Sequence, residues 1–583
     1  MPNPRIIPSP AAKDVVTSTI KVNGNALSRT FEVAAISVVK NIGRIPFARI
    51  ELYDGDPASE TFPACDDPTL DPGGEIEITA GYRSNETPIF KGILTSHSIR
   101  LRSSGRSLLT LVCRHPLYQA SLTRRSRSFQ DFTDSDAISE ILGSYNVSIE
   151  TDATEVTHES LFQYHCTDWD FCVARAHANS RLLIPTDEGA SLKTLDAGQE
   201  PSLQLQYGAT LLELDVELDI RSQPTEATAT SWDPASQEIL ESTASEPSLP
   251  SAGNQNADSL AALHGQSQHF HHAGAVTQEE LDAFASGQLL LQRLGARVGR
   301  ARCMGIAEPL PGQLVDIAGI SDRFSGSYLI SGVRHTLSQG TWYTDLQIGM
   351  LPEKAAANAR TEAAAPFASS MLPHASGLHI GIVEALEGDP QSEFRIQVKL
   401  PTQGEDAAPY WARLASIDAG ESRGAFLYPE IGDEVVVAFF DHDPRHPLVL
   451  GSLYSSARPA PLEPSDDNHE KGFFSRSEMK LLFNDDLVSA TLETPNGNIL
   501  QLSEDEGAIL IEDENGNKIT LNADGIELSS AADLNLSASG DINIEGTNVT
   551  LKANAQFTAE GASAAELKAS GNTTIKGALV QIN

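Results

Sequence analysis

Pairs of apolar residues recur with a short period along the C-terminal part of the chain. From about Leu492 onward, two apolar residues separated by one residue return roughly every eight residues, and Asn, Asp, Gly, Ser and Ala fill the gaps. Residues i and i+2 of a strand point to one face, and the intervening residue types favour turns. The pattern predicts a stack of short strands with one apolar face. The predicted core residues are Ile519, Leu521, Ile526, Leu528, Leu534, Leu536, Ile542, Ile544, Val549 and Leu551.

A unit of one strand and one turn cannot cover its own apolar face. Stacked strands of this kind need closure, which an elongated chain can reach by wrapping around copies of itself. We therefore expect residues 485–583 to form a narrow homotrimeric needle, an intertwined trimeric β-helix. The alternatives are a single-chain solenoid, which needs coils of about twenty residues or more, and a calcium repeat. Successive Gly-Gly-x-Gly-x-Asp runs would indicate calcium, but only isolated pairs such as Asp524-Gly525 occur.

Polar and Pro-rich stretches divide the rest of the chain. Residues 351–376 are rich in Ala with Pro366 and Pro373, which is typical of a linker. Residues 456–484 separate compact sequence from the repeat, and residues 223–258 have the Ser, Thr, Ala and Pro content of a long surface insertion. The predicted order is a domain over 1–350 that contains the insertion, the linker 351–376, a domain over 377–455, the connector 456–484 and the needle 485–583.

The composition is that of an assembly component. The chain has 583 residues, enough for several domains, and its formal net charge of -38 opposes binding to nucleic acids or anionic membranes. No stretch approaches the roughly eighteen apolar residues of a membrane helix. The N-terminal sequence MPNPRIIPSP lacks the apolar core of a signal peptide. We expect synthesis in the cytoplasm and, if the protein leaves the cell, export by another route.

The sequence predicts no catalytic residue, no cofactor and no metal site. It lacks a Gly-x-Ser-x-Gly elbow, an HExxH motif and a P-loop. The cysteines show no CxxC spacing, so neither a zinc site nor a disulfide framework is indicated, and we expect reduced core thiols. The cysteines are Cys65, Cys113, Cys166, Cys172 and Cys303.

One group of histidines could still gather a metal ion. His269, His271 and His272 lie in the run HFHHAG, and imidazole is a common ligand. The segment lacks helical ligand spacing and nearby Cys or acidic partners, so a polar loop is the favoured interpretation. His442, between Asp441 and Asp443, is explained by turn chemistry without a metal.

The first block has a mixed α+β pattern. Strands are predicted at 15–22, 31–39, 74–82 and 107–113, and helices at 134–145 and 278–300. Thr133 with Asp136, and Thr277 with Glu280, have the spacing of capping boxes, which satisfy free amides at a helix start. The Arg-rich run 124–127 is expected to pair with acidic neighbours on a surface strand or loop rather than to bind phosphate.

The second block predicts a small β-barrel. Apolar and polar residues alternate between Gly, Pro and Asp turns in the segments 394–401, 410–416, 424–440 and 446–454. About five short strands suit an OB-type barrel. Such a barrel can bind single-stranded nucleic acid through exposed aromatics beside a basic groove. Here acidic residues outnumber Lys and Arg, so the aromatic residues are expected in the core; they are Tyr410, Trp411, Phe439 and Phe440.

Stretches of both blocks resemble one known family. In the first block they are FKGILTSHSIRL (90–101), residues 108–142, and residues 162–184, in which Gln163 to Phe171 is the most distinctive part. In the second block they include Trp411-Ala412-Arg413, Pro429 to Val435 and Gly451-Ser452-Leu453-Tyr454. These stretches resemble the hub and OB domains of contractile injection spikes. That family includes tailed-phage tail hubs, VgrG proteins of type VI secretion and the spikes of extracellular phage-tail-like particles.

The resemblance implies a mechanical role for the chain. The predicted architecture is a mixed α+β hub, an OB-type β-barrel and the C-terminal intertwined trimeric β-helix needle. A homotrimer would join the inner tube and baseplate at its hub, and sheath contraction would drive the spike through a target cell envelope. The assembled particle is extracellular or delivered outward. Phage tail, type VI and extracellular particle remain open, and the alternatives of another class are an OB-type nucleic-acid binder and a spike-linked hydrolase.

The end of the chain is the expected docking place of a partner. Residues 565–583 resemble the terminal needle sequences of spikes that receive a PAAR-type tip protein. A β-rod that ends in apolar residues also exposes strand edges that need a cap. The alternative is that these residues only complete the last coil. The expected docking residues are Lys576, Gly577, Leu579, Val580, Gln581, Ile582 and Asn583.

Overall fold

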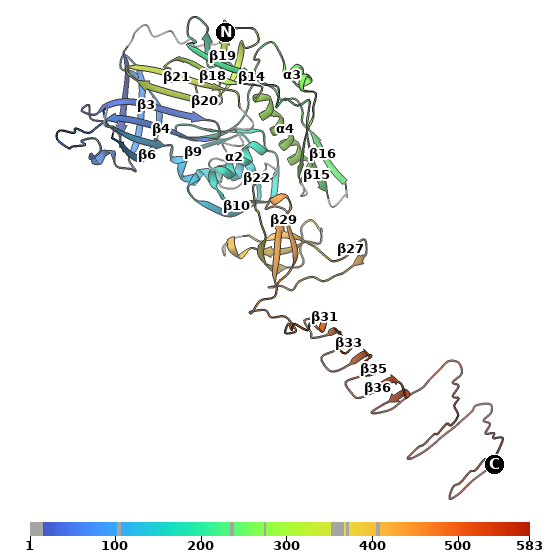
Figure 1. Cartoon of the computed structure of the whole chain (residues 1–583). Helices are drawn as coiled ribbons and strands as arrows, with labels where there is room; N and C mark the ends of the chain where they lie inside the picture. The colour runs from blue at the N-terminus through green and yellow to red at the C-terminus, as the bar shows by residue number, and fades with distance from the viewer. Residues whose placement is uncertain are drawn as a thin grey trace. The chain divides into compact units, whose positions relative to one another are not determined.

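Strands dominate the structure, a computed structural model (Figure 1). It describes residues 15–101, 106–233, 238–272, 276–350, 367–368, 372–403 and 408–582. The chain divides into two compact units, Met1–Tyr454 and Ser455–Asn583. Much of the predicted linker, 351–366 and 369–371, lies outside the described residues, as do residues 1–14 and the predicted docking residue Asn583.

A 13-stranded sheet forms the scaffold of the first unit. Its strands are β1 (Val16–Val22), β2 (Asn25–Ala26), β3 (Glu32–Asn41), β4 (Arg44–Tyr53), β5 (Glu75–Tyr82), β6 (Asn85–Arg100), β7 (Leu108–Arg114), β13 (Leu203–Gln206), β14 (Glu213–Leu218), β18 (Arg297–Met304), β19 (Leu314–Ala318), β20 (Gly326–Ser338) and β21 (Thr341–Ile348). The order is β14-β18-β21-β20-β3-β4-β7-β6-β5-β1-β2, with β13 and β19 attached through β20. Strand β20 therefore joins the N-terminal strands to those near residue 350. The four strands predicted in this region are all present.

Two helices pack with smaller sheets to form a second core of this unit. Helices α1 (Asp134–Gly143) and α2 (Asp168–Ala178) contact each other. The small sheets pair β8 (Arg124–Thr133) with β10 (Thr157–Thr167), and join β11 (Arg181–Pro185), β12 (Gly189–Thr194) and β9 (Ser148–Thr151). Thr133 caps α1 by accepting from the Asp136 amide, as predicted from the sequence. The short 3-10 helix η2 (Pro116–Ser121) adds Leu117 to this core, whereas η1 (Pro68–Leu70) adds Leu70 to the core of the large sheet.

The predicted insertion 223–258 is packed against a helix. It contains β15 (Ala227–Asp233) and β16 (Glu238–Thr243), which form a sheet with β17 (Gln268–His272). Helix α4 (Gln278–Leu294), capped by Thr277, lies on β15 and β16, and the short α3 (Ala257–His264) precedes β17 in the chain. The helix predicted to reach residue 300 ends at Leu294, because β18 begins at Arg297. No helix within the described residues is long and apolar enough to cross a membrane.

A closed five-stranded barrel completes the first unit. Its order is β24 (His379–Ala385), β25 (Ile396–Lys399), β26 (Tyr410–Leu414), β30 (Pro447–Ser452) and β29 (Glu434–Phe439). The minor elements are β22 (Phe367–Ala368), β23 (Leu372–Pro373), β27 (Ala419–Gly420), β28 (Arg423–Gly424), η3 (Pro401–Gln403) and η4 (Phe440–His442). The barrel predicted from alternation is therefore present, but its first strand, β24, escaped that prediction. Closure leaves no long unpaired strand edge on the barrel.

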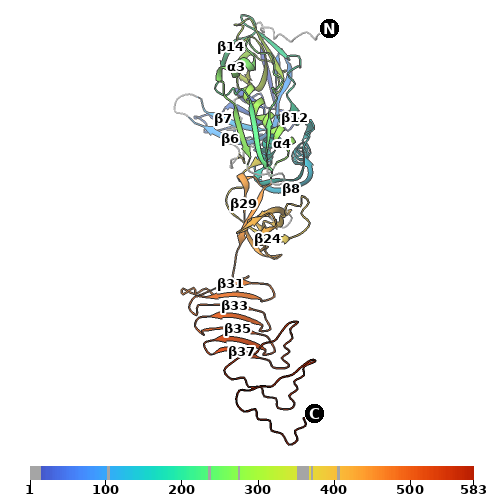
Figure 2. The ribbon, with the colours of Figure 1, turned by 90° about the vertical axis from the view of Figure 1, so that its right-hand side faces the viewer.

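The second unit is a ladder of short strands (Figure 2). Its seven-stranded sheet pairs each strand with the next in antiparallel order. The strands are β31 (Glu470–Phe474), β32 (Lys480–Asn484), β33 (Ser489–Glu493), β34 (Ile499–Ser503), β35 (Ala508–Glu512), β36 (Lys518–Asn522) and β37 (Gly525–Ser529). The sheet begins inside the predicted connector 456–484, where Phe473 and Phe483 extend the apolar pattern. Residues 530–582 contain no strand.

Candidate functional site

One face of the β31–β37 sheet, which we call the apolar face, is built from two rows of side chains that are apolar except for Lys471. Residues directly opposite each other in antiparallel strands share a face. The first row runs through Phe473, Leu481, Leu492, Leu500, Ile511, Ile519 and Leu528. The second runs through Lys471, Phe483, Ala490, Leu502, Ile509, Leu521 and Ile526. The opposite face carries Gly472, Leu482, Thr491, Gln501, Leu510, Thr520 and Glu527.

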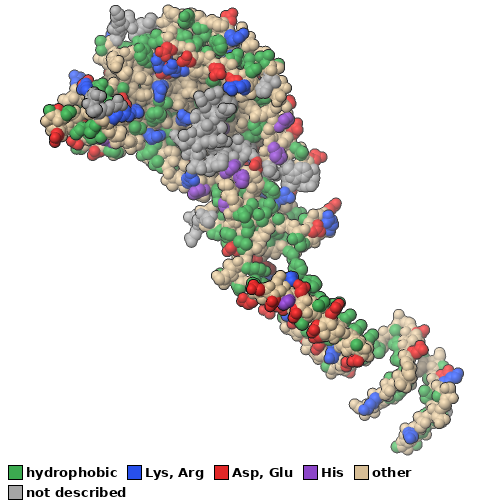
Figure 3. All heavy atoms as spheres, in the orientation of Figure 1, with side chains coloured by type: hydrophobic (Ala, Val, Ile, Leu, Met, Phe, Trp, Pro, Cys, Tyr) green, Lys and Arg blue, Asp and Glu red, His purple; other side chains and the backbone are tan. Residues whose placement is uncertain are grey.

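The apolar face is uncovered in a single chain. Leu500, Leu502 and Ile511 are 40%, 50% and 45% exposed. In a core sheet such side chains would be almost fully buried. In Figure 3 hydrophobic and acidic side chains of this unit gather on different sides. An apolar surface of this extent marks an interaction site rather than a surface that rests in water.

Tight turns fix which residues reach the apolar face. Asn496-Gly497 and Asn515-Gly516 lie between consecutive strands, with Gly497 at φ +90 and Gly516 at φ +85, a region that favours glycine. These turns let each strand fold back on the preceding one, so the backbone pairing over Glu470–Ser529 lies within one chain. The intertwined trimeric β-helix predicted from the sequence would place that backbone pairing between chains instead. Asn-Gly between alternating segments is a hairpin signal that could have indicated this order.

The predicted needle-core residues fall into two groups. Ile519, Leu521, Ile526 and Leu528 lie on the apolar face. The other six lie in residues 530–582 and are between 53% and 69% exposed; they are Leu534, Leu536, Ile542, Ile544, Val549 and Leu551. A strand needs a hydrogen-bonded neighbour, and a single chain supplies none there. Their place in a core remains a prediction.

The predicted docking residues are also solvent-exposed in the single chain. Leu579, Val580 and Ile582 are 78%, 47% and 86% exposed. Lys576, Gly577 and Gln581 are exposed as well. The described docking residues thus present apolar surface without a covering element, and their role remains a prediction.

Within the first unit, the stretch around Gln163 joins the hub to the barrel. The Phe162 ring stacks on Tyr410 of β26 with ring centroids 4.0 Å apart. The Tyr164 hydroxyl lies 3.0 Å from Nδ1 of His379 in β24. Phe162 also belongs to the core of the barrel together with Phe439. Strand β10 of the hub therefore supplies part of the barrel's own core.

Tyr410 and Phe439 lie in the barrel core, as predicted, whereas Trp411 and Phe440 are half-buried.

A chain of buried charges, which we call the junction network, crosses from the hub to the barrel. Arg175 of α2 donates to Asp134 of α1, with Nη2 2.9 Å from Oδ2, and lies 3.5 Å from Glu280 of α4. Arg445, after η4 in the barrel, donates to Glu280. It also donates to Asp443, with Nη2 2.7 Å from Oδ2. Buried ion pairs of this kind require every member, because removal of one leaves an uncompensated charge.

The guanidinium groups of the network keep its carboxylates ionised. Burial alone would raise the pKa of Glu280, but Arg445 and Arg175 outweigh it and lower the pKa to about 2. Burial opposes ionisation of Asp443 in the same way, and Arg445 holds the pKa of that carboxyl well below its usual range. The Glu280 amide donates to the capping residue Thr277, while its carboxylate pairs with Arg445 and Arg175.

The Arg-rich run pairs with acid as predicted. Nη2 of Arg127 donates to both carboxylate oxygens of Asp168, at 2.7 and 2.8 Å. Nε of Arg125 lies 3.9 Å from the same carboxylate. Tyr145 and Gln163 also donate to Asp168. The carboxylate is fully buried, so the distinctive Gln163–Phe171 stretch contains a buried charge and one of its donors, Gln163.

The histidines of the run HFHHAG lie in a strand, so the prediction of a polar loop is wrong. β17 pairs with β15 in parallel, and strand alternation separates the three side chains. His269 and His271 are exposed, whereas His272 is 2% exposed. Nε2 of His272 lies 3.0 Å from Oδ2 of Asp443 in the barrel. The sequence could not show this partner, which lies 171 residues away.

All five cysteines are free in the structure. Four are buried, which agrees with core thiols, and burial raises the pKa of Cys113 to about 12. Cys65 is half-buried, and its Sγ lies 3.3 Å from Nε2 of His97. Burial also raises the pKa of Cys65, so proximity to the imidazole does not make it a reactive thiolate.

Comparison with known families covers most of the chain. Residues 12–339 match the family described as Alg8 N-terminal domain. Residues 379–454 match the type VI secretion system/phage-baseplate injector OB domain. Residues 489–556 match the phage baseplate V C-terminal trimerisation domain. The chain belongs to the Alg8 N-terminal domain family and is a VgrG-like spike protein.

Individual relatives of this VgrG-like spike align over short segments. The type VI secretion system spike protein VgrG4b of Pseudomonas aeruginosa is 44% identical over 61 residues, 10% of this chain and 8% of that protein. VgrG1b of the same organism is 26% identical over 199 residues, 32% of this chain and 27% of that protein. The chain thus matches only about a quarter or less of the length of these relatives.

Solved structures show the same fold over a longer span. A Francisella PdpA-VgrG complex in its half-lidded form aligns with a TM-score of 0.51 at 10% identity. The alignment covers 89% of this chain and 88% of that chain. At this identity the likeness shows the fold of a VgrG-like spike and does not identify partners.

Proposed function

We propose that three copies of this chain assemble into the hub and puncturing spike of a contractile injection system. The observation that carries the proposal is the uncovered apolar face of β31–β37. Three such sheets packed around one axis would bury their apolar faces against one another and leave the opposite faces in water. The match of residues 489–556 to a trimerisation domain supports three copies as the occupant.

The energetic gain favours association strongly. Burying a Leu or Ile side chain contributes roughly 1.5 to 3 kcal/mol, and each sheet presents two rows of them. Ordering entropy and the loss of free rotation of three chains offset part of this sum. Because the strands already pair within one chain, the other copies supply apolar contacts over Glu470–Ser529, whereas residues 530–582 would also gain their strand partners in the trimer.

The first unit supplies the remaining parts of the proposed machine. The hub would join the inner tube to the baseplate, and the barrels would form a collar below it. The stacked Phe162–Tyr410 pair and the junction network fasten hub and barrel, as axial load on a spike demands. The needle would carry a PAAR-type tip at Lys576–Ile582, and contraction of a sheath would drive it through a target envelope. The particle would act outside the cytoplasm in which the chain is made.

Native mass measurement of the full chain tests the proposal. The expected result is a trimer that persists at low micromolar concentration, with hydrophobic dye binding suppressed because the apolar face is covered. A folded monomer that binds the dye would contradict the proposal. A dimer or an open polymer would contradict the threefold packing, although either assembly could still cover the apolar face.

A further inference from the structure

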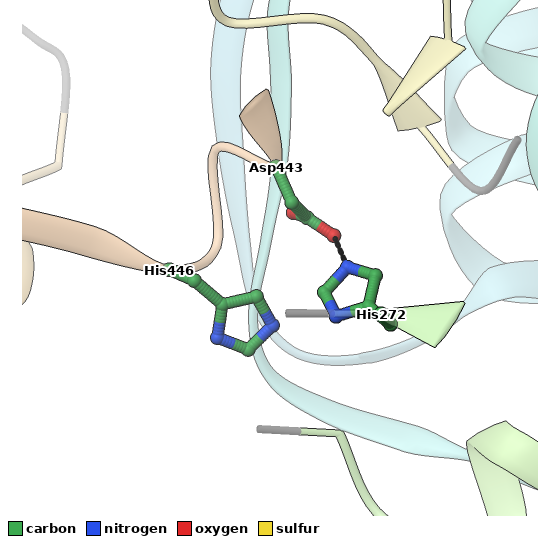
Figure 4. Close-up of side chains that lie close together, drawn as sticks. All are labelled: His272, Asp443 and His446. Carbon is green, nitrogen blue, oxygen red and sulfur yellow. Dashed lines mark hydrogen bonds and ion pairs between the residues drawn. The ribbon is translucent and has the colours of Figure 1, made fainter. Parts of the chain in front are cut away.

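Three metal-binding side chains meet where the hub touches the barrel. His272 ends strand β17 of the hub, and Asp443 and His446 lie between η4 and β30 of the barrel. One ligand atom from each lies within 4.8 Å of the other two. Among the described residues this is the group of His and acidic side chains close enough to hold one ion. Figure 4 shows the His446 ring turned toward His272.

The His446 imidazole is the least satisfied member of this group. Its Nε2 atom is buried and has no hydrogen-bond partner among the described residues. The ring centroids of His272 and His446 are 5.2 Å apart. Burying a polar atom without a hydrogen-bond partner costs roughly 1 to 3 kcal/mol of folding free energy. Such atoms are rare in native proteins, so this nitrogen needs an explanation. A cation between the two rings would give this nitrogen a partner.

The charge of the junction network also favours a cation. Asp134, Glu280 and Asp443 contribute three carboxylates, whereas Arg175 and Arg445 contribute two guanidinium groups. One buried negative charge is therefore left over when the histidines are neutral. Arg445 is already engaged by Glu280 and Asp443. Asp443 also accepts from the Arg445 amide and lies 3.0 Å from Nε2 of His272. A carboxylate has about four lone-pair positions, so a metal ion would take the place of the His272–Asp443 hydrogen bond.

A cavity borders His446, one of the three side chains. It has a volume of about 210 Å³ and is lined by His446, Arg445 and Glu280 together with residues of β10 and β26. This space can admit an ion and hold water as a further ligand. Two imidazoles and one carboxylate form a donor set suited to borderline transition metals, whereas Ca²⁺ and Mg²⁺ prefer sets made only of oxygen.

We propose that His272, Asp443 and His446 bind one divalent transition-metal ion per chain, with Zn²⁺ as the best-matched ion. The ion ties β17 of the hub to the loop before β30 of the barrel. It would act as a clamp at the joint that transmits load from the hub to the barrel. The assignment depends only on contacts within the first unit and is independent of the trimeric needle.

Metal analysis of the full-length, untagged protein tests the clamp. After chelation and dialysis, titration with Zn²⁺ followed by calorimetry should give one site per chain, and Co²⁺ should give visible d–d absorption. Ca²⁺ and Mg²⁺ should not compete. Replacing a direct ligand, as in His446→Gln, should weaken Zn²⁺ binding by more than the roughly 10- to 100-fold typical of outer-shell changes. Loss of bound Zn²⁺ should also lower the melting temperature of the wild-type first unit.

Two exposed histidines provide the matched control. His269→Gln and His271→Gln change the same strand on its outer side and should leave Zn²⁺ affinity unchanged. Absence of stoichiometric Zn²⁺ binding by the wild-type chain would overturn the proposal, as would undiminished binding by a folded His446→Gln protein. If His446→Gln does not fold, the Co²⁺ spectrum of the wild-type protein decides, because a spectrum that stays identical to that of aqueous Co²⁺ excludes this site.

Discussion

Arg445 lies between two buried carboxylates and is the residue on which the junction network depends. It donates to Glu280 of α4 and to Asp443 of its own loop, and its side chain is 7% exposed. Arg445→Met would leave Asp443 buried without its guanidinium partner and Glu280 with Arg175 alone, so we expect the first unit to lose about 3 to 5 kcal/mol of stability. Chemical denaturation monitored by tryptophan fluorescence measures this change.

The control for Arg445→Met is a surface arginine that also pairs with an aspartate. Arg423 pairs with Asp418 at 2.9 Å, and their side chains are 69% and 57% exposed. Exposed pairs contribute roughly 0 to 1 kcal/mol. Arg423→Met should therefore leave the denaturation midpoint almost unchanged, and equal losses in the two variants would show that the junction network contributes little.

His335 of β20 makes the hub sensitive to acid. Burial lowers its pKa to about 3, whereas a histidine in the unfolded chain titrates near about 6.5. Between these values the unfolded chain binds a proton that the folded chain does not, so the free energy of unfolding falls as the pH falls from about 6.5 toward about 3. The melting temperature should drop across this window.

The variant His335→Gln isolates this contribution. It removes the titrating group, so the melting temperature should depend less steeply on pH between about 4.5 and 6.5 than in the wild-type protein. Part of the slope should persist because burial also lowers the pKa of His115, to about 4. His269→Gln changes an exposed histidine and should leave the slope as it is. An unchanged slope in His335→Gln would contradict the assignment.

At the residue scale, the sequence could predict what depends on neighbours in the chain. Thr133 and Thr277 cap their helices as expected, since the spacing of a cap is local. The ion pair between Glu280 and Arg445 could not be predicted from the sequence, because the two residues are 165 positions apart. Asp443 and His446 could not be predicted as neighbours of His272 for the same reason.

At the element scale, the two faces of the β31–β37 sheet predict opposite responses to the same substitution. Leu502 lies on the apolar face, and its neighbour Gln501 lies on the opposite face. In the proposed trimer, Leu502→Asp would bring three carboxylates near one axis, where lost hydration and mutual repulsion cost several kcal/mol. We expect this variant to lose the trimer in native mass measurement or to melt at a much lower temperature.

Gln501→Asp introduces the same charge one residue away. Thr491 and Leu510 lie opposite Gln501, so no carboxylate faces the new one in the sheet. Its effect should stay within about 0.5 kcal/mol, as for ordinary surface substitutions. If both variants remain trimeric and melt alike, the apolar face is not the trimer contact.

The sequence predicted the alternation in these strands more readily than their pairing. The i and i+2 pairs indicate one apolar face, since strand periodicity is local. Which strand pairs with which is decided by the turns, and the Asn-Gly signals at 496–497 and 515–516 favour hairpins within one chain. Strand β24 of the barrel escaped prediction because its Gly381 and His379 interrupt the β-branched pattern.

At the scale of the whole molecule, the two units differ in how far a single chain buries its apolar side chains. The barrel is closed and shares its core with Phe162 of the hub, so that the first unit can transmit force through packed side chains. The second unit leaves its apolar side chains exposed in a single chain. A spike built this way would fold its hub within each chain and complete its needle only on assembly. Dilution should therefore affect the second unit before the first.

The proposed tip platform gives the last prediction. Deleting residues 576–583 removes the exposed Leu579, Val580 and Ile582, which would present three copies of an apolar surface to one small conical partner. We expect the truncated protein to lose capture of the PAAR-like protein in a pull-down while it stays trimeric and keeps its melting temperature, because the strands β31–β37 end at Ser529.

Alanine replacement of Glu566 and Lys568 is the control for this deletion. These two residues are exposed, with side chains 77% and 84% accessible, and lie before the deleted segment. The double variant should capture the partner as the intact spike does, since it removes one negative and one positive charge near the end but keeps the apolar platform. Undiminished capture by the truncated spike would place the docking surface elsewhere, and residues 576–582 would then serve only to complete the last turn of the needle.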